Sequence, residues 1–480
     1  MKARYRPYNP EEGYFSLIDP KDIKNHNPLL KAIDSFVEGH ISVEPFSQSV
    51  KNEIEGAPAV HPKMMLKVIF YSYAKGIYSS REMEDRMRWD PNYIYLSANQ
   101  GVDHSTICNF ILKYGDEIKS VFSRLVYVMA KMGYITMDFV AVDGTKIQAD
   151  ASKKFTGNAA EFRKKRDTIE RKIEKILHNT MEEGAEGKAR QQKKLGSLER
   201  DKRKIEDFLA EVEKGEAPAG EKVSLTNRDA RLVKDNDVKY MGYNCQIGVD
   251  GKEDVIAGAG VFDNASDRGL LQPMIQEVKG STCNDLSKTD IGFDSGFFSS
   301  DNILHCHTEH LNVFLPEGKG ENGVRQWKDD VITSRDCQLE IDGEIKRLAC
   351  PGGQVMETTV AREDRGNYFY RFHPKARICP DCQFRTRCYR NTNTNKGFSV
   401  KQEYFDTLPL RALMTEKLSS EHGKERMKDR SCVVEHVFGE IKDIFKFRRF
   451  MHRSLEKVRI IWQLVCIGYN FRKLARLAYV

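Results

Sequence analysis

Residues 141–147, AVDGTKI, decide how this sequence is interpreted. The apolar run 139–142 is rich in residues that favour strands, and it stops abruptly at Asp143, which Gly144 follows. A buried strand that ends in an acid presents the carboxylate at the edge of the sheet, next to solvent. Because Asp-Gly is also an ordinary turn sequence, Asp143 predicts a functional site only if other acids of the chain join it.

Length and charge limit the classes of protein that fit. A chain of 480 residues favours two to four domains with a sizeable core, and 31% charged residues indicate a globular protein with a strongly charged surface. The net charge is only +7, but residues 441–480 contain ten Lys or Arg against two acids. A concentrated basic segment favours an anionic partner, and nucleic acid fits best.

The sequence predicts a cytoplasmic protein. The N-terminus, MKARY, leads into a polar stretch and contains no signal peptide. The longest apolar run, 460–471, is interrupted by Gln463 and Asn470 and is too short to span a bilayer. Eleven cysteines scattered along a chain without a secretory signal are typical of a reducing compartment.

The first 130 residues predict a set of short helices. Helical periodicity covers 27–37, Pro62 opens a second helix, Ser79 caps a third with Glu82 behind it, and Asp103 starts a fourth. These helices fit a helix-turn-helix DNA-binding unit and a plain helical bundle equally well.

A charged segment follows, with 29 charged residues among the 54 of 161–214. Apolar residues recur along it at helical spacing, which predicts a charged helical hairpin. We expect a solvated spacer that packs along one seam, and the alternative is that its basic clusters contact phosphates.

Strand patterns return after this hairpin. Residues 243–249 alternate, 255–262 are apolar, and a helix is expected at 270–278. A further strand leads into 290–297, DIGFDSGF, where Asp294 is a second acid placed after a strand and Asp290 mimics it. This order of elements predicts a mixed sheet flanked by helices.

Four cysteines gather between residues 318 and 400: Cys350, Cys379, Cys382 and Cys388. Cys379 and Cys382 form a CxxC knuckle, and Cys388 follows after five intervening residues. Four thiolates suffice to close a tetrahedral zinc site, which can stabilise a segment with little core of its own. An iron–sulfur cluster and unliganded thiols are the alternatives.

The last informative stretch is 428–442, KDRSCVVEHVFGEIK. In a helix, Lys428, Glu435 and Lys442 would share one face, because they lie seven residues apart. Glu435 is then either a salt-bridged surface acid or a metal-binding acid with lysines placed for phosphates.

In this order the motifs resemble a DDE transposase of a bacterial insertion sequence, with a ribonuclease H-like catalytic domain. The first motif matches at 143–145, the second at 294–297 with Ser299 and Asn302 behind it, and the third at Glu435 with Phe438, Gly439 and Lys442. The N-terminal helices resemble one branch of the family, on residues 61–67 and 103–107. The stretch 243–246 and the cysteine-bearing insertion also fit that branch.

Two positions depart from the family pattern. The family commonly has an arginine four residues before the glutamate, where this chain has Ser431 with Arg430 one residue earlier, and Lys428 is a possible substitute. Asp290 competes with Asp294 for the second motif. We prefer Asp294, because the small polar residues follow it in the expected places.

The resemblance implies an α/β fold, an RNase H-like mixed sheet flanked by helices with additional segments. The expected parts are a helical DNA-binding domain at 1–132, the catalytic domain at 133–317 and 401–480, a charged helical insertion at 155–222, and a Cys-rich, zinc-ribbon-like insertion at 318–400.

It also implies the activity, which is binding of terminal inverted repeats followed by metal-dependent DNA cleavage and strand transfer. Asp143 would bridge two Mg²⁺ (or Mn²⁺) ions, with Asp294 and Glu435 each completing one side. The expected partners are double-stranded DNA, as element ends and target, and further copies of the chain in a dimer or larger synaptic assembly at the bacterial nucleoid. The expected DNA contacts are Lys428, Arg430, Lys442, Arg448 and Arg449. A catalytically inactive DNA-binding regulator and a zinc-ribbon interaction protein are the alternatives.

Overall fold

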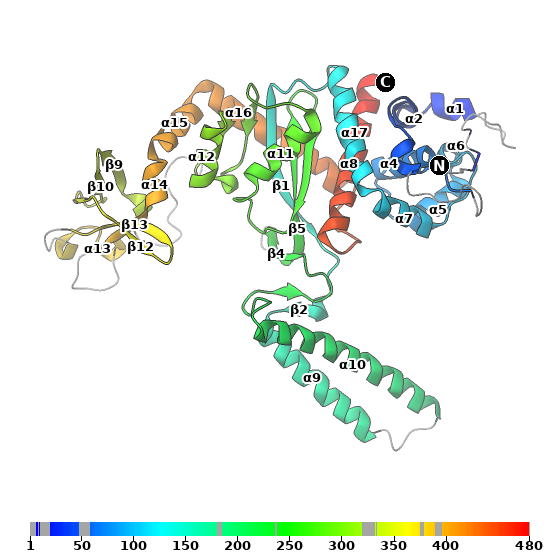
Figure 1. Ribbon diagram of the computed structural model, residues 1–480, viewed down its shortest axis with the longest axis horizontal. Coiled ribbons are helices and arrows are strands. Elements are labelled where there is room, and N and C mark those ends of the chain that lie inside the picture. The colour runs from blue at the N-terminus through cyan, green and yellow to red at the C-terminus, as the bar shows by residue number, and fades with distance from the viewer. Residues whose placement is uncertain are drawn as a thin grey trace. The chain divides into compact units, whose positions relative to one another are not determined.

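The computed structural model describes residues 6–7, 9, 20–47, 58–179, 185–235, 238–318, 332, 334–374, 379–388 and 396–479 (Figure 1). The chain forms two compact units. The first comprises Met1–Asp267, Pro273–Asp285 and Ser431–Val480, and the second comprises Arg268–Gln272 and Leu286–Arg430. The fold is mixed α/β with a helical N-terminal region, as predicted.

Over its described residues, the N-terminal region of the first unit consists of helices joined by loops, with no strand before Phe139. Its helices are α1 Pro20–Asn25, α2 Pro28–His40, α3 Glu44–Ser47, α4 Pro62–Ala74, α5 Ser80–Trp89, α6 Pro91–Leu96, α7 His104–Lys113 and α8 Gly115–Lys131. The predicted helix starts at Ser79 and Asp103 are confirmed, since each side chain accepts a backbone amide at a helix N-terminus. Asn27 caps α2 in the same way, although the sequence predicted only helical periodicity there.

The C-terminal helix α17 (Leu455–Ala478) is the centre of this region and packs against α2, α4 and α8 (Figure 1). Most of its residues are buried, as in α4. A helix that is apolar around most of its circumference belongs inside a core. Gly468 makes close packing possible, because a Cβ there would lie 2.8 Å from backbone atoms of Tyr73 and Ala74.

The sheet of the first unit follows the predicted strands. β1 (Phe139–Gln148) is antiparallel to β5 (Val238–Asp250), which also pairs with β4 (Arg231–Asp235) and β6 (Val255–Phe262). Helix α11 (Leu271–Thr282) approaches β5 and β6 at Val278, where only glycine fits at positions 248 and 258.

The predicted charged segment contains two long helices, α9 (Ala159–Asn179) and α10 (Ala185–Glu213). They pack along an apolar seam that includes Phe162 and Phe208. The short strand β2 (Thr156–Gly157), which precedes α9, pairs with β3 (Val223–Ser224), which follows α10. The turn expected between the two helices lies outside the described residues. The fold of this segment therefore agrees with the seam that was predicted from its periodicity.

The second unit contains the parallel pair β7 (Asp290–Gly292) and β8 (Val313–Phe314) with α12 (Ser300–Thr308) between them. Small antiparallel sheets follow, formed by β9 Gln338–Asp342, β10 Ile345–Ala349, β11 Val355–Thr358, β12 Ala361–Asp364, β13 Asn367–Phe372 and β14 Phe398–Lys401. Parts of the predicted 318–400 insertion, at 319–331, 333, 375–378 and 389–395, lie outside the described residues.

The chain then becomes helical again. α14 (Gln402–Asp406) and α15 (Leu408–Ser419) lead into α16 (Glu421–Gly439), which continues as a π-helical turn at Glu440–Ile444. In the described ranges, no helix is both long and apolar enough to cross a membrane.

Candidate functional site

Asp143 lies in the middle of β1 rather than at its end, because the strand continues to Gln148. Its side chain is half-buried, and its Oδ1 accepts the Gly144 amide at 2.7 Å. Asp143 is opposite Ile247 and Gly144 is opposite Gln246 across the β1–β5 pair. Since faces alternate along a strand, Gly144 and Gln246 share the face that Asp143 does not occupy.

A polar cluster that the sequence analysis missed lies on the Gly144 face. Asp267 Oδ1 accepts from Lys146 Nζ at 2.9 Å, from Asn244 Nδ2 at 2.6 Å and from Gln246 Nε2 at 2.8 Å. Gln246 and Asn244 are almost completely buried. In the sequence, YNCQ at 243–246 indicated only a family resemblance, although two amide side chains two residues apart in an expected strand were an available signal.

This cluster explains the glycine of the first motif. A Cβ at position 144 would lie 2.0 Å from Gln246 Nε2, so the carboxamide occupies the space that any side chain at 144 would need. One side of Gly144 therefore meets Gln246, and its amide holds the Asp143 carboxylate. Gly144 thus contacts a side chain on each face of the strand, Gln246 on one and Asp143 on the other.

The two aspartates of the second motif have different environments. Asp290 opens β7 and is only 9% exposed; its carboxylate accepts from His422 Nε2 at 2.8 Å, Arg426 Nε at 2.8 Å and Asn312 Nδ2 at 2.5 Å. Asp294 is half-buried and accepts the Gly296 amide at 2.6 Å as the cap of a short 3₁₀ turn. In the part of the chain that the structure describes, Asp294 forms no ion pair.

Ser299 and Asn302, which follow Asp294, serve the local fold. Ser299 caps α12 by accepting the Asn302 amide at 3.1 Å. The Asn302 side chain is 4% exposed and donates to the carbonyls of Phe297 and Arg268, both at 2.6 Å. These two residues fix the loop that carries Asp294, so their part in the motif is structural support.

Glu435 lies on α16 and is exposed, while Val434 and Val437 beside it are buried. No hydrogen bond or ion pair to another described residue holds its carboxylate. Lys442 does not continue the α-helical face expected for it, because it lies in the π-helical turn, where each turn contains more residues. Its Nζ is 3.9 Å from Asp235 Oδ2 on β4.

The lysine also lies near β5. Burial raises the pKa of Cys245 well above its ordinary value, and the Lys442 ammonium is near enough to oppose that shift. Cys245 is opposite Thr145, two residues beyond Asp143 on the same face. Within the first unit, the segment that begins at Glu435 therefore brings Lys442 close to β4 and β5.

The predicted DNA-binding residues have unequal access to solvent. Lys428 is exposed, whereas Arg430 is only 9% exposed. Arg448 is exposed and pairs with Asp443. Arg449, also exposed, pairs with Asp150 at 2.8 Å, and a fourth arginine, Arg453, reaches the same carboxylate at 2.7 Å. The sequence analysis did not single out Arg453.

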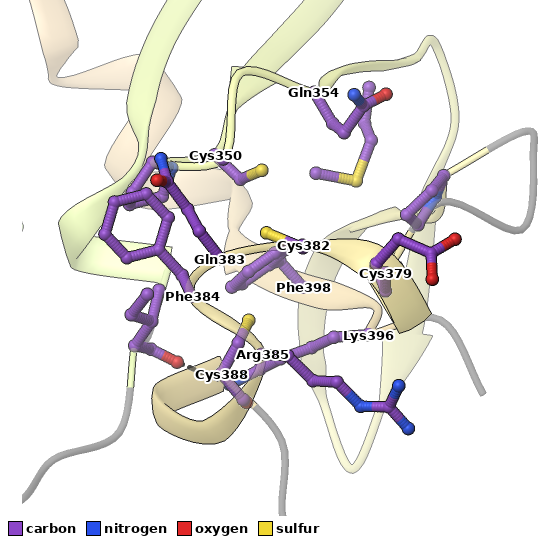
Figure 2. Close-up of a pocket in the computed structure, with 16 residues that line it drawn as sticks. Cys350, Gln354, Cys379, Cys382, Gln383, Phe384, Arg385, Cys388, Lys396 and Phe398 are labelled. Atoms are coloured by element: carbon purple, nitrogen blue, oxygen red, sulfur yellow. Dashed lines mark hydrogen bonds between the residues drawn. The ribbon is translucent and has the colours of Figure 1, made fainter. Parts of the chain in front are cut away.

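The four cysteines of the second unit line one cavity of about 580 Å³ (Figure 2). Burial raises the pKa of the Cys388 thiol, and Lys396 is close enough to oppose this shift. All eleven cysteines are free of disulfide bonds. Among the described residues, no three His, Cys, Asp or Glu side chains are arranged tightly enough to hold a metal ion.

Comparison with known protein families identifies two segments. Residues 17–113 match the Transposase domain (DUF772) family, and residues 349–475 match the Transposase DDE domain family. The second match contains Glu435 and the four cysteines, whereas Asp143 and Asp294 lie between the two matches. No curated protein and no solved structure matches the chain.

The two matches lie at the N-terminal helices and at the glutamate-bearing region, as the resemblance requires. Both matched families are transposase families, so the comparison supports the predicted family, a DDE transposase of an insertion sequence.

Proposed function

We propose that this transposase binds the terminal inverted repeats of its element and catalyses divalent-metal-dependent DNA cleavage and strand transfer through Asp143, Asp294 and Glu435. The catalytic part is RNase H-like and comprises 133–317 and 401–480, with a DNA-binding domain at 1–132 and inserted segments at 155–222 and 318–400. The proposal is supported by the family matches and by the order of strand, strand and helix that carries the three acids.

The observation that carries this assignment is the contrast between these acids and their neighbours. Asp290, Asp267 and Asp150 are each bound by two or more cationic or amide side chains. Asp294 and Glu435 make no ion pair with any described residue, so their carboxylates are available to ligands. Three carboxylates also provide the hard oxygen donors that Mg²⁺ prefers, so the donor chemistry of these residues suits magnesium.

Two bound divalent cations would stabilise charge on the attacking and leaving oxygens of the phosphodiester. Asp143, Asp294 and Glu435 would together hold these cations. Cleavage adds water to the scissile phosphorus and breaks its bond to O3′, which leaves a 3′-hydroxyl. In strand transfer that hydroxyl attacks a phosphorus of the target DNA, and the target's own O3′ departs with the proton.

The basic residues of the α16–α17 segment would hold the DNA backbone. Lys428, Arg448 and Arg449 are exposed, and Lys442 lies beside the sheet. Arg430 is buried, so a phosphate contact from it would require local rearrangement. We propose that two or more copies of the chain bring the element ends together, as expected for this family.

The test is cleavage of the element's own inverted-repeat DNA by purified protein with and without Mg²⁺ or Mn²⁺. Asp143→Ala, Asp294→Ala and Glu435→Ala should each abolish nicking and leave DNA binding within a few-fold of wild type. Asp301→Ala, which removes an acid from α12 outside the proposed set, is the matched control and should cleave normally. DNA binding without metal-dependent cleavage by the wild-type protein would instead identify an inactive regulator.

A further inference from the structure

We propose that Cys350, Cys379, Cys382 and Cys388 bind one Zn²⁺ ion as a tetrathiolate, and that this ion stabilises the small β region 332–401 of the second unit. This site is separate from the proposed catalytic acids, and its chemistry is independent of DNA cleavage. The inference rests on where the four thiols lie and on the backbone turns that present them.

The first thiol is presented by a tight turn that links β10 to β11. The Cys350 amide donates to Gln354 O at 2.9 Å, the Gly353 amide donates to Cys350 O at 2.9 Å, and Gly353 has φ +79°. A Cβ on Gly352 would lie 2.8 Å from Cys382 Sγ and 3.6 Å from Cys350 Sγ. Two thiols from separate segments therefore meet over a glycine, and a larger residue at 352 would separate them.

The other three thiols belong to one compact turn and helix. The 3₁₀ turn Cys379–Asp381 leads into α13 (Arg385–Cys388). The Cys382 amide donates to Cys379 O at 3.4 Å, and the Cys388 amide donates to Phe384 O at 2.9 Å. Figure 2 shows the sulfur atoms of Cys350 and Cys382 directed toward one another, with Cys388 on the adjoining helix. The backbone thus brings all four thiols to the same cavity.

The thiols line the cavity without closing on a single point. Rotation between staggered rotamers moves sulfur atoms while the backbone stays in place. Binding of the ion supplies the free energy for that closure and for release of the thiol protons, because zinc binding and folding are coupled in small metal-stabilised regions.

Zinc is favoured by the donor set and by the charges around it. Soft thiolates select zinc or iron–sulfur clusters over hard cations. Four thiolates around Zn²⁺ carry a net charge of about −2, which needs nearby cations. Lys396 donates to Cys388 O at 2.7 Å and also to Ile332 O, and Arg385 borders the cavity. Lys396 therefore links its own segment to Cys388 and to Ile332.

The described part of this region has a small apolar core, so a bound ion would add to its stability. Among its described residues, the buried cluster contains eight: Ile332, Leu348, Met356, Tyr370, Phe372, Phe398, Val400 and Phe405. A core of this size supplies little stability, and natural small folds add a metal or disulfides. A fifth thiol, Cys337, packs against the core but does not line the cavity, so it is excluded from the ligand set.

The test is zinc content of the full-length protein, purified under reducing conditions and dialysed against metal-free buffer. We expect about one zinc ion per chain in wild type, and in Cys283→Ser and Cys337→Ala. Cys382→Ser and Cys379→Ser should lose at least nine-tenths of the zinc. Equal zinc content in all five proteins would overturn the proposal, and so would wild type that takes up no zinc when it is added, or that contains iron and inorganic sulfide with visible absorption.

A second measurement uses wild-type protein, so its result does not depend on whether the cysteine variants fold. Wild-type protein depleted of zinc and titrated with Co²⁺ should develop the charge-transfer bands of a tetrahedral thiolate site, and added Zn²⁺ should remove them. Hydrogen exchange of β10–β13 should accelerate on chelation and recover with Zn²⁺. Cobalt spectra without thiolate bands would exclude the tetrathiolate. Asp143→Ala should keep its zinc, so failure of the catalytic proposal leaves this result unaffected.

Discussion

Strands β1 and β7 each place one acid of the proposed catalytic set near a second aspartate. In both pairs, the two carboxylates have different hydrogen-bond donors. Near β1, Asp267 receives three donors through one oxygen, while Asp143 is held by a backbone amide. Near β7, Asp290 is bound by an arginine, a histidine and an asparagine, while Asp294 caps a short turn. Near β7, the donors around the carboxylate, rather than the motif, therefore distinguish the structural acid Asp290 from the candidate ligand Asp294.

The largest expected effect comes from replacing each of the two acids near β7, Asp294 and Asp290, in turn. Asp294→Asn should abolish DNA cleavage and leave the free energy of unfolding unchanged, because its carboxylate makes no ion pair among the described residues. Asp290→Asn should retain cleavage while lowering the free energy of unfolding by about 1.5–3 kcal/mol, because hydrogen bonds to a charged group are lost. Urea unfolding and a nicking assay on the same preparations measure both quantities.

His422→Ala is a control for this pair, since it removes one donor from Asp290 and should reproduce part of the stability loss without affecting cleavage. Cleavage by Asp294→Asn together with inactivity of a folded Asp290→Asn protein would reverse the assignment.

The next largest effect should come from Asp267, a positioning residue on the opposite face of β1. Asp267→Ala removes the acceptor that anchors Gln246 against Gly144, and we expect cleavage to fall by about 10–100-fold, as for other residues that orient metal ligands. The Mg²⁺ concentration that gives half-maximal cleavage should rise, which a purely structural role would not cause.

Asp263→Ala is the matched control, because Asp263 lies in the same loop and forms only a half-exposed pair with Arg231 at 2.9 Å. Asp267→Glu should recover part of the activity. If Asp267→Ala cleaves with an unchanged Mg²⁺ requirement, the positioning role is wrong.

The sequence predicted the helices and strands more accurately than the side-chain contacts around the acids. Caps at Ser79 and Asp103 and the strand patterns depend on residues within a few positions, so local rules located them. Asp267 escaped notice because its donors come from β1 and β5, and only folding brings them to it. Asp290 looked like Asp294 for the same reason, since the residues that bind it lie more than 20 positions away. The π-helical turn after Glu435 leaves no mark in helical periodicity.

A smaller effect is expected from filling the space over Gly144. Gly144→Ala places a Cβ 2.0 Å from Gln246 Nε2, and overpacking of this kind costs about 1–3 kcal/mol of folding free energy. Gln246→Ala opens that space, so the double variant Gly144→Ala/Gln246→Ala should be more stable than the sum of the single effects predicts. Thermal or urea unfolding of the four proteins gives the coupling. Additive effects would show that the carboxamide does not constrain Gly144.

The smallest effect concerns Asp150, just beyond β1, where the two exposed arginines 449 and 453 meet one carboxylate. Burial raises the pKa of Asp150, but Arg453 and Arg449 outweigh it and hold the pKa below its ordinary value of 3.8. The ion pairs therefore contribute stability above that pH and lose it as the pH falls through the lowered pKa. Because the partners are half-exposed, the contribution should be about 0–1 kcal/mol.

Asp150→Asn removes that contribution and releases both arginines toward phosphates. The stability difference from wild type, measured by urea unfolding, should shrink as the pH is lowered below 3.8. At neutral pH the variant should bind inverted-repeat DNA more tightly at low salt. Its log–log salt slope should steepen by about 0.9 for each additional phosphate that an arginine neutralises. Arg453→Ala in the same background should reverse part of the steepening, whereas an unchanged slope would mean that this pair of arginines does not face DNA.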